Sequence, residues 1–217
     1  MARKSLIVFQ QENSSYNSKK ILIKIGSALT KSKGKFNYFL IKKEVKEISQ
    51  LMKLNKIVLV TSGAVACGME ILKIKEKPKD IFSLQILSGI GQAALISRYK
   101  KMFAKEGIKI AQVLLTHHNF ISKKERKIII KIIESYLAIG ILPIINENDL
   151  INKEELEYKK IFTDNDMLSA ILAKELKIDL ALMLTNVSGL YNKNPQEKDA
   201  KLIKEVKKIN KEPSKWK

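Results

Sequence analysis

Short apolar runs alternate with longer stretches of helical spacing along most of the chain. The short runs are rich in isoleucine, leucine and valine, and they predict strands at residues 21–25, 57–60, 110–115, 141–145 and 180–184. The longer stretches predict helices at residues 41–54, 64–72, 82–105, 123–138 and 164–176. Because the strands are apolar on both faces and helices lie between them, the pattern is typical of an α/β protein. Its sheet is expected to be mostly parallel and covered on both sides.

Two places depart from this alternation. Residues 1–19 include a polar stretch without an apolar period, so we expect a mobile tail that precedes one domain at residues 20–217. Pro143 has no backbone N–H to donate, which predicts that strand 141–145 is irregular or lies at an edge of the sheet.

The chain is strongly basic, with a formal net charge of +19 over 217 residues. Such a charge would suit a polyanionic partner. Only three of the 41 basic residues are arginines, however, and aromatic residues make up 6%, so the groups that read and stack on nucleic acids are scarce. We therefore expect no nucleic-acid partner and attribute the charge to a lysine- and isoleucine-rich composition.

Cys67 is the only cysteine, which excludes an internal disulfide and a multi-cysteine metal site. Without a secretory core near the start of the chain, this predicts a reducing, cytoplasmic location. The longest uncharged stretch, residues 81–97, falls short of a membrane-spanning helix, so no membrane partner is expected. His117 and His118 have no third ligand at useful spacing, and we interpret them as loop residues rather than a metal site.

Polar and glycine residues gather after the predicted strands. In a doubly wound sheet, ligands bind beyond the carboxyl ends of the strands, so these residues are candidates for one binding site. They are Lys24, Gly26 and Ser27; Thr61, Ser62 and Gly63; Asn146, Glu147, Asn148 and Asp149; Asp164, Asn165 and Asp166, which open the last helix; and Thr185 and Asn186.

Most of these groups also have a simpler interpretation, and for residues 146–149 it is a solvated loop. Lys24 is either a strand-end lysine that reaches solvent or a charge aimed at a phosphate, which Gly26 would let approach the backbone. Ser62 either caps a helix or helps a helix N-terminus to hold an anion. Asp164 and Asp166 either stabilise a helix N-terminus or, beside Lys24, hold Mg²⁺ or orient lysines around a transferring phosphoryl group.

Several segments, taken in order, resemble the glutamate 5-kinases, a group within the amino acid kinase family. They are residues 23–27, 60–66, 89–92, 111–116, 143–149, 164–166 with 168–170, and 184–185 with 189–191. The stretch Ile-Asn-Glu-Asn-Asp at 145–149, followed by Asp-Asn-Asp at 164–166, is the most specific part of the match. The resemblance extends over most of the chain, from about residue 20 to about residue 206.

The resemblance implies a three-layer αβα sandwich of the carbamate kinase-like type. It also implies transfer of the ATP γ-phosphoryl group, with Mg²⁺, to the γ-carboxylate of L-glutamate, the first step of proline biosynthesis. Lys24 would contact the transferred phosphate and Asp166 would orient the catalytic lysine. The implied ATP-binding residues are Lys24, Gly26, Ser27, Thr185 and Asn186, and the implied glutamate-binding residues are Ser62, Asn146, Asp149 and Asn165. Relatives commonly form oligomers, so a homo-oligomer is expected.

The chain departs from the family pattern at four places. Thr163 stands where Gly is usual, Asn186 stands where Asp is usual, and residues 153–160 form a charged insert. The sequence stops at Lys217, before the glycine-rich nucleotide segment and second catalytic lysine of the family, so the domain is expected to be incomplete at its C-terminus. The alternative to a working kinase is therefore a catalytically impaired remnant that binds glutamate without turnover.

Overall fold

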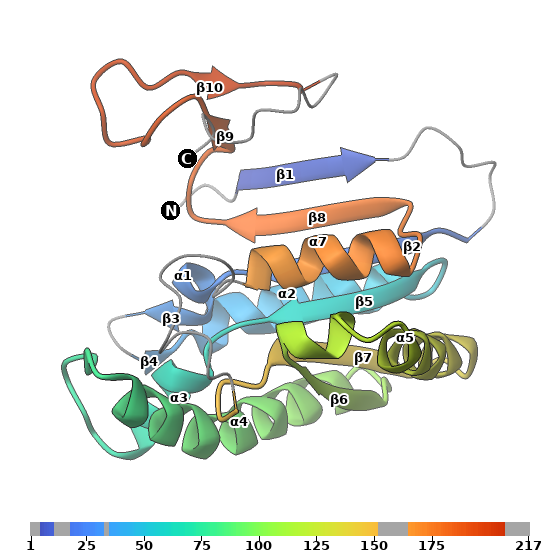
Figure 1. Ribbon diagram of the computed structural model, residues 1–217, viewed down its shortest axis with the longest axis horizontal. Helices are drawn as coiled ribbons and strands as arrows, with labels where there is room; N and C mark the ends of the chain where they lie inside the picture. The colour runs from blue at the N-terminus through green and yellow to red at the C-terminus, as the bar shows by residue number, and fades with distance from the viewer. Residues whose placement is uncertain (1–4, 11–17, 33–34, 152–164, 207–217) are drawn as a thin grey trace.

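A computed structural model describes residues 5–10, 18–32, 35–151 and 165–206 (Figure 1). Its main sheet has six strands in the order β1, β8, β2, β5, β7, β6. Their bounds are β1 Ser5–Gln10, β2 Lys20–Ile25, β5 Lys56–Thr61, β6 Ile110–Leu115, β7 Leu142–Glu147 and β8 Leu180–Thr185. All pairs are parallel except β1 with β8. The predicted α/β class with a mostly parallel sheet is confirmed.

Helices pack on both faces of the sheet, which gives the expected three layers (Figure 1). Apolar residues of α2 and α4 pack on one face, and those of α5 and α7 pack on the other. The helices are α1 Ser27–Thr30, α2 Tyr38–Leu51, α3 Ala64–Ile71, α4 Ile81–Ala104, the 3-10 turn η1 His117–Phe120, α5 Lys123–Ala138 and α7 Asn165–Glu175. Two short hairpins complete the fold: β3 Lys31–Ser32 with β4 Lys35–Phe36, and β9 Leu190–Tyr191 with β10 Leu202–Ile203. In the described ranges, no helix has the length and apolarity to cross a bilayer.

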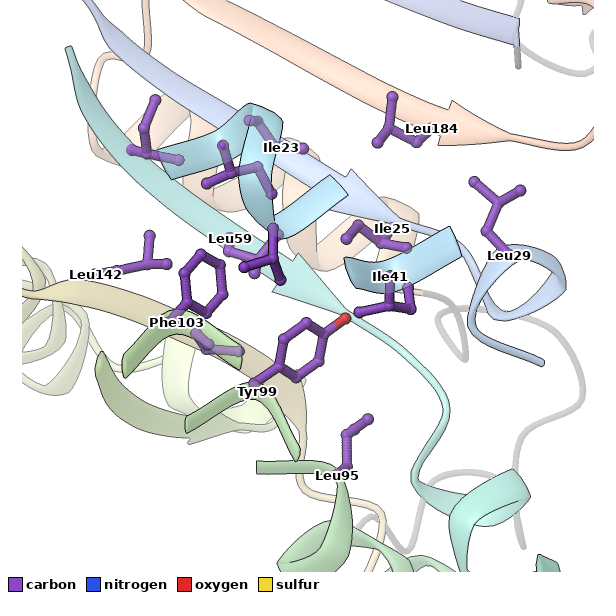
Figure 2. Packing of buried hydrophobic residues seen from close by; sticks show 14 of the residues in the cluster. Ile23, Ile25, Leu29, Ile41, Leu59, Leu95, Tyr99, Phe103, Leu142 and Leu184 are labelled. Carbon is purple, nitrogen blue, oxygen red and sulfur yellow. The ribbon is translucent and has the colours of Figure 1, made fainter. Parts of the chain in front are cut away.

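Alternation along each strand divides the core into these two faces. Ile21, Ile23 and Ile25 of β2 belong to the cluster under α2 and α4, whereas Leu22 belongs to the cluster under α5 and α7. Figure 2 shows the first cluster, with Tyr99 and Phe103 of α4 among the strand residues. Because successive side chains in a strand point to opposite faces, position 24 shares the α5 and α7 face with Leu22.

Residues 5–10 form strand β1, although the sequence predicted a mobile tail at residues 1–19. Residues 5–10 pair antiparallel with β8 along its whole length, from Ser5 opposite Thr185 to Gln10 opposite Leu180. The apolar run at 6–9 was included in the tail because the polar stretch that follows it has no apolar period, and its pairing partner lies far away in the chain. Residues 11–17 lie outside the described residues.

Pro143 lies in an interior strand, so the prediction of an edge position is wrong. Strand β7 lies between β5 and β6, and Pro143 is buried. The pairing with β5 begins at Ile144, directly after the proline, whereas the pairing with β6 begins one residue before it. The missing N–H thus falls where the ladder with β5 has not yet begun.

Two glycines bring α3 and α4 into backbone contact. A methyl group at Gly68 would overlap the carbonyl of Leu87, and one at Gly91 would overlap the carbonyl of Ala64. Since backbone atoms cannot move aside as a flexible side chain does, these positions accept only glycine at this helix separation. The contact places α4 directly against the start of α3.

We predict that Gly91→Ala destabilises the protein. The added methyl group would force α3 and α4 apart, with an expected loss of about 1–3 kcal/mol in the free energy of unfolding. Gly89→Ala on the same helix is the matched control, because its methyl group meets only the flexible Leu150 side chain, at 3.1 Å. Urea denaturation measures both, and equal midpoints for the two variants would contradict the role of the contact.

Candidate functional site

The carboxyl ends of four parallel strands meet at one edge of the sheet. Strand β2 lies between β5 on one side and β8 on the other, so successive strands are added in opposite directions from it. This is the switch point at which ligands bind in open α/β sheets. The site residues predicted after β2, β5, β7 and β8 are thereby brought to one edge.

Lys24 is buried and paired with a carboxylate. It is 8% exposed, and its Nζ lies 2.5 Å from Oδ1 of Asp166, whose side chain is about half exposed. The alternation of β2 directs Lys24 to the face covered by α7, where Asp166 lies in the first turn. A buried amine is costly without an opposite charge, and a carboxylate is favoured near a helix N-terminus. The interpretation of Lys24 as a strand-end lysine reaching solvent is therefore wrong.

Gly26 keeps the space beside the Lys24 amine open. Its backbone N–H donates to the Leu184 carbonyl at 3.2 Å, which joins the end of β2 to the end of β8. A side chain at this position would begin 3.3 Å from that carbonyl and 3.5 Å from Nζ of Lys24. Thr185 and Asn186 follow Leu184 directly, so they lie at the end of β8 that Gly26 contacts, and the exposed Ser27 follows Gly26. We call Lys24, Gly26, Ser27, Asp166, Thr185 and Asn186 the lysine site.

Ser62 does not cap α3. The N-cap is Gly63, whose φ of 114° lies in the left-handed region that favours glycine. The Ser62 hydroxyl instead accepts a hydrogen bond from Nδ2 of Asn165, at 2.8 Å. The capping interpretation of Ser62 is therefore wrong, and the residue connects the end of β5 to the start of α7.

Hydrogen bonds between amide side chains extend this connection to β7 and α4. Asn165 Nδ2 also donates to Oδ1 of Asn146 at 3.2 Å, and Asn146 Nδ2 donates to Oε1 of Gln92 at 2.7 Å. Oδ1 of Asn165 is buried and has no hydrogen-bond partner among the described residues. An unpaired buried acceptor is costly, so it indicates a place for a ligand donor. We call Ser62, Gln92, Asn146 and Asn165 the amide cluster.

Asp149 is a largely buried carboxyl group. Burial raises its pKa above the ordinary value, and this effect outweighs a hydrogen bond from Ser88 and the charge of Lys77, which both lower it. Ser88 Oγ donates to Oδ2 of Asp149 at 2.5 Å. Asp149 is thus joined to α4 by a side-chain contact, as Asn146 is through Gln92.

The structure brings the predicted residues together in two neighbouring sets. Asn165 belongs to the amide cluster and Asp166 to the lysine site, so two consecutive residues of α7 join the sets. Asp149 connects to the amide cluster through α4. Thr163, Asp164 and the insert at 153–160 lie outside the described residues. Ser88 and Gln92 were not predicted as site residues, although residues 89–92 are part of the resemblance.

A model of the amino acid kinase family matches residues 19–210, which include both sets of site residues. The chain belongs to the amino acid kinase family. Among solved structures, an isopentenyl phosphate kinase shares the fold with a TM-score of 0.58 at 17% identity, over 85% of this chain and 79% of that one. This family membership confirms the fold class that the resemblance implied.

Curated proteins that match the chain include glutamate 5-kinases. The protein from Streptococcus agalactiae serotype III (strain NEM316) is 38% identical over 189 residues, which cover 86% of this chain and 71% of the relative. The protein from Thermoanaerobacter sp. (strain X514) is 40% identical over 196 residues, which cover 89% of this chain and 52% of the relative. Both relatives are longer than this chain, and the resemblance to glutamate 5-kinases is confirmed.

Cys67 lies on α3 and belongs to neither set of site residues. It is fully buried, and burial raises the pKa of its thiol to about 11, more than the nearby Arg98 lowers it. We predict that Cys67 resists alkylation in the folded protein.

At pH 8 only about one thiol in a thousand would be ionised at that pKa, because the thiolate fraction falls tenfold for each pH unit below the pKa. Iodoacetamide labelling followed by mass measurement tests this, with the urea-unfolded protein as the control. Labelling of folded and unfolded protein at equal rates would contradict it.

Proposed function

We propose that this chain transfers the γ-phosphoryl group of ATP to the γ-carboxylate of L-glutamate, the first step of proline biosynthesis. The glutamate 5-kinases among its relatives support this substrate pair. The observation that carries the proposal is the adjacency of Asn165 and Asp166 at the start of α7. One residue belongs to a cluster suited to an amino acid, and the next holds a lysine suited to a phosphoryl group.

In the proposed reaction, a γ-carboxylate oxygen of glutamate attacks the γ-phosphorus of ATP. The new P–O bond forms as the bond to the β–γ bridging oxygen breaks, and ADP leaves with that electron pair. Lys24 stabilises the negative charge on the transferring group, and Asp166 orients its amine. Gly26 leaves room for the phosphate, with Ser27, Thr185 and Asn186 binding the nucleotide.

Glutamate binding follows from the donors and acceptors that remain open. The unpaired Oδ1 of Asn165 and the carboxylate of Asp149 are acceptors for the substrate ammonium group. The Ser62 oxygen already accepts from Asn165, so its own hydrogen is left to donate to the substrate carboxylate. Asn146 completes the set by holding Asn165 in place.

Mg²⁺ enters this proposal with the nucleotide. No group of three His, Cys, Asp or Glu side chains in the described parts of the chain is placed to hold a metal ion. Asp166 is already paired with Lys24. The ion would therefore be bound mainly by the ATP phosphates, whose charge it would partly neutralise. The proposal also includes a cytoplasmic homo-oligomer without a membrane or nucleic-acid partner.

We predict that Lys24→Met abolishes most of the activity. The substitution removes the amine that faces the transferring group but keeps the apolar stem, and the expected loss in kcat is about 10²–10³-fold. Hydroxylamine trapping of γ-glutamyl phosphate, with ATP, Mg²⁺ and L-glutamate, measures it. Lys42→Met, at an exposed position on α2, is the matched control and should retain full activity.

Thermal unfolding of each variant separates lost chemistry from lost structure. Full activity in Lys24→Met would contradict the role of the amine. Absence of product from the folded, unsubstituted chain would contradict the kinase proposal. Glutamate-induced stabilisation of that chain would then support the alternative of binding without turnover.

A further inference from the structure

We propose that Ser88 and Gln92 of α4 are positioning residues that fix the orientation of the substrate-binding groups of Asp149 and Asn146. The two residues lie four positions apart, so they share one face of the helix. The inference rests on the proposed function, because it concerns how the same site holds its amino-acid substrate.

Gln92 sets the orientation of two amides in sequence. Its Oε1 accepts from Nδ2 of Asn146, which leaves Oδ1 of Asn146 facing Asn165. That oxygen and the Ser62 oxygen then accept from Nδ2 of Asn165, whose two N–H groups are thereby both used. Oδ1 of Asn165 is consequently the atom left for a ligand donor. Without the acceptor at position 92, the Asn146 amide can turn over and the orientation of Asn165 is no longer determined.

Ser88 acts on the carboxyl group in a similar way. It is 3% exposed and donates to one carboxylate oxygen of Asp149, which fixes the direction of the group. A hydrogen bond to the charged form also favours ionisation, which opposes the effect of burial. Among the described residues, the charged group that lowers the pKa of Asp149 is Lys77, in the segment between α3 and α4. Ser88 therefore helps to keep Asp149 an ionised acceptor for an ammonium group.

The rigidity of α4 makes this positioning effective. Gly91 lies between the two residues and contacts the carbonyl of Ala64, two positions after Ser62. The helix that holds Asn146 and Asp149 is thus in backbone contact with the segment that carries Ser62. Because α3 and α4 are closely packed, the side chains that they hold keep a fixed separation. Substrate binding requires such a fixed arrangement.

The first test uses Gln92→Met and Gln92→Glu. Methionine keeps the size of the side chain but removes the acceptor, whereas glutamate keeps an acceptor oxygen. We expect Gln92→Met to raise KM for L-glutamate about tenfold, the effect of losing one hydrogen bond in a buried network, with KM for ATP unchanged. Gln92→Glu should recover most of this loss. Gln50→Met, at an exposed position on α2, is the control.

The second test uses Ser88→Ala, with Ser97→Ala at an exposed position of α4 as the control. Removal of the hydrogen bond should raise the pKa of Asp149 further. Because the carboxylate is the binding form, kcat/KM for glutamate should then be lost at a higher pH as the pH falls. Carbon-13 NMR of the Asp149 carboxyl group in the ligand-free protein measures the same change without substrate.

The NMR titration keeps this inference separate from the proposed function. A moved Asp149 titration in a chain that neither binds nor phosphorylates glutamate would support the Ser88 contact and contradict the function. An unmoved titration in Ser88→Ala would overturn the inference even if the chain is an active kinase. Equal increases in the KM values for glutamate and ATP in Gln92→Met would also overturn it, since they would indicate a general structural defect.

Discussion

The site depends on a lysine amine that is buried at the end of a central strand. Lys24 follows aliphatic residues in β2, and at 8% exposure its charge has little access to water. Such a charge requires a partner, and the strand alternation decides that this partner must come from the α7 side. Asp166 supplies it from the first turn of α7. The ion pair therefore connects the first turn of α7 to the end of β2, next to Asn165 of the amide cluster.

The opposite side of the site is held by packing rather than by charge. Gly68 and Gly91 allow α3 and α4 to meet backbone to backbone, so the segment that carries Ser62 and the helix that carries Gln92 cannot shift independently. The amide cluster spans this contact and ends on α7. The position of Asn165 thus depends both on the ion pair and on the glycine contact. Its acceptor oxygen remains unpaired among the described residues.

Much of the fold and of the site could be predicted from the sequence because each depends on local patterns. Apolar runs located the parallel strands, and the rule that ligands bind beyond the carboxyl ends of strands located Lys24, Ser62 and Asn146 at one edge. Asn165 was found at the start of the last predicted helix. The pairing of β1 with β8 and the interior place of β7 depend on neighbours distant in sequence, which periodicity does not reveal. Ser88 and Gln92 were missed for the same reason: their partners lie 61 and 54 residues away.

The placement of charge in the site suits two anionic substrates that must meet in one orientation. The chain carries a net charge of +19, which raises the local concentration of anions but does not orient them. To orient the amino acid, the site must bind its ammonium end and its γ-carboxylate end with groups of different charge. In the proposed function, Asp149 would accept from the ammonium group of glutamate, and Lys24 would stabilise the phosphoryl group transferred to its γ-carboxylate. Because burial disfavours the ionised form of Asp149, the acidic end depends on the groups that lower its pKa, Ser88 and Lys77. In the proposed function, the contacts of Ser88 and Gln92 are therefore part of how the site distinguishes the two ends of glutamate.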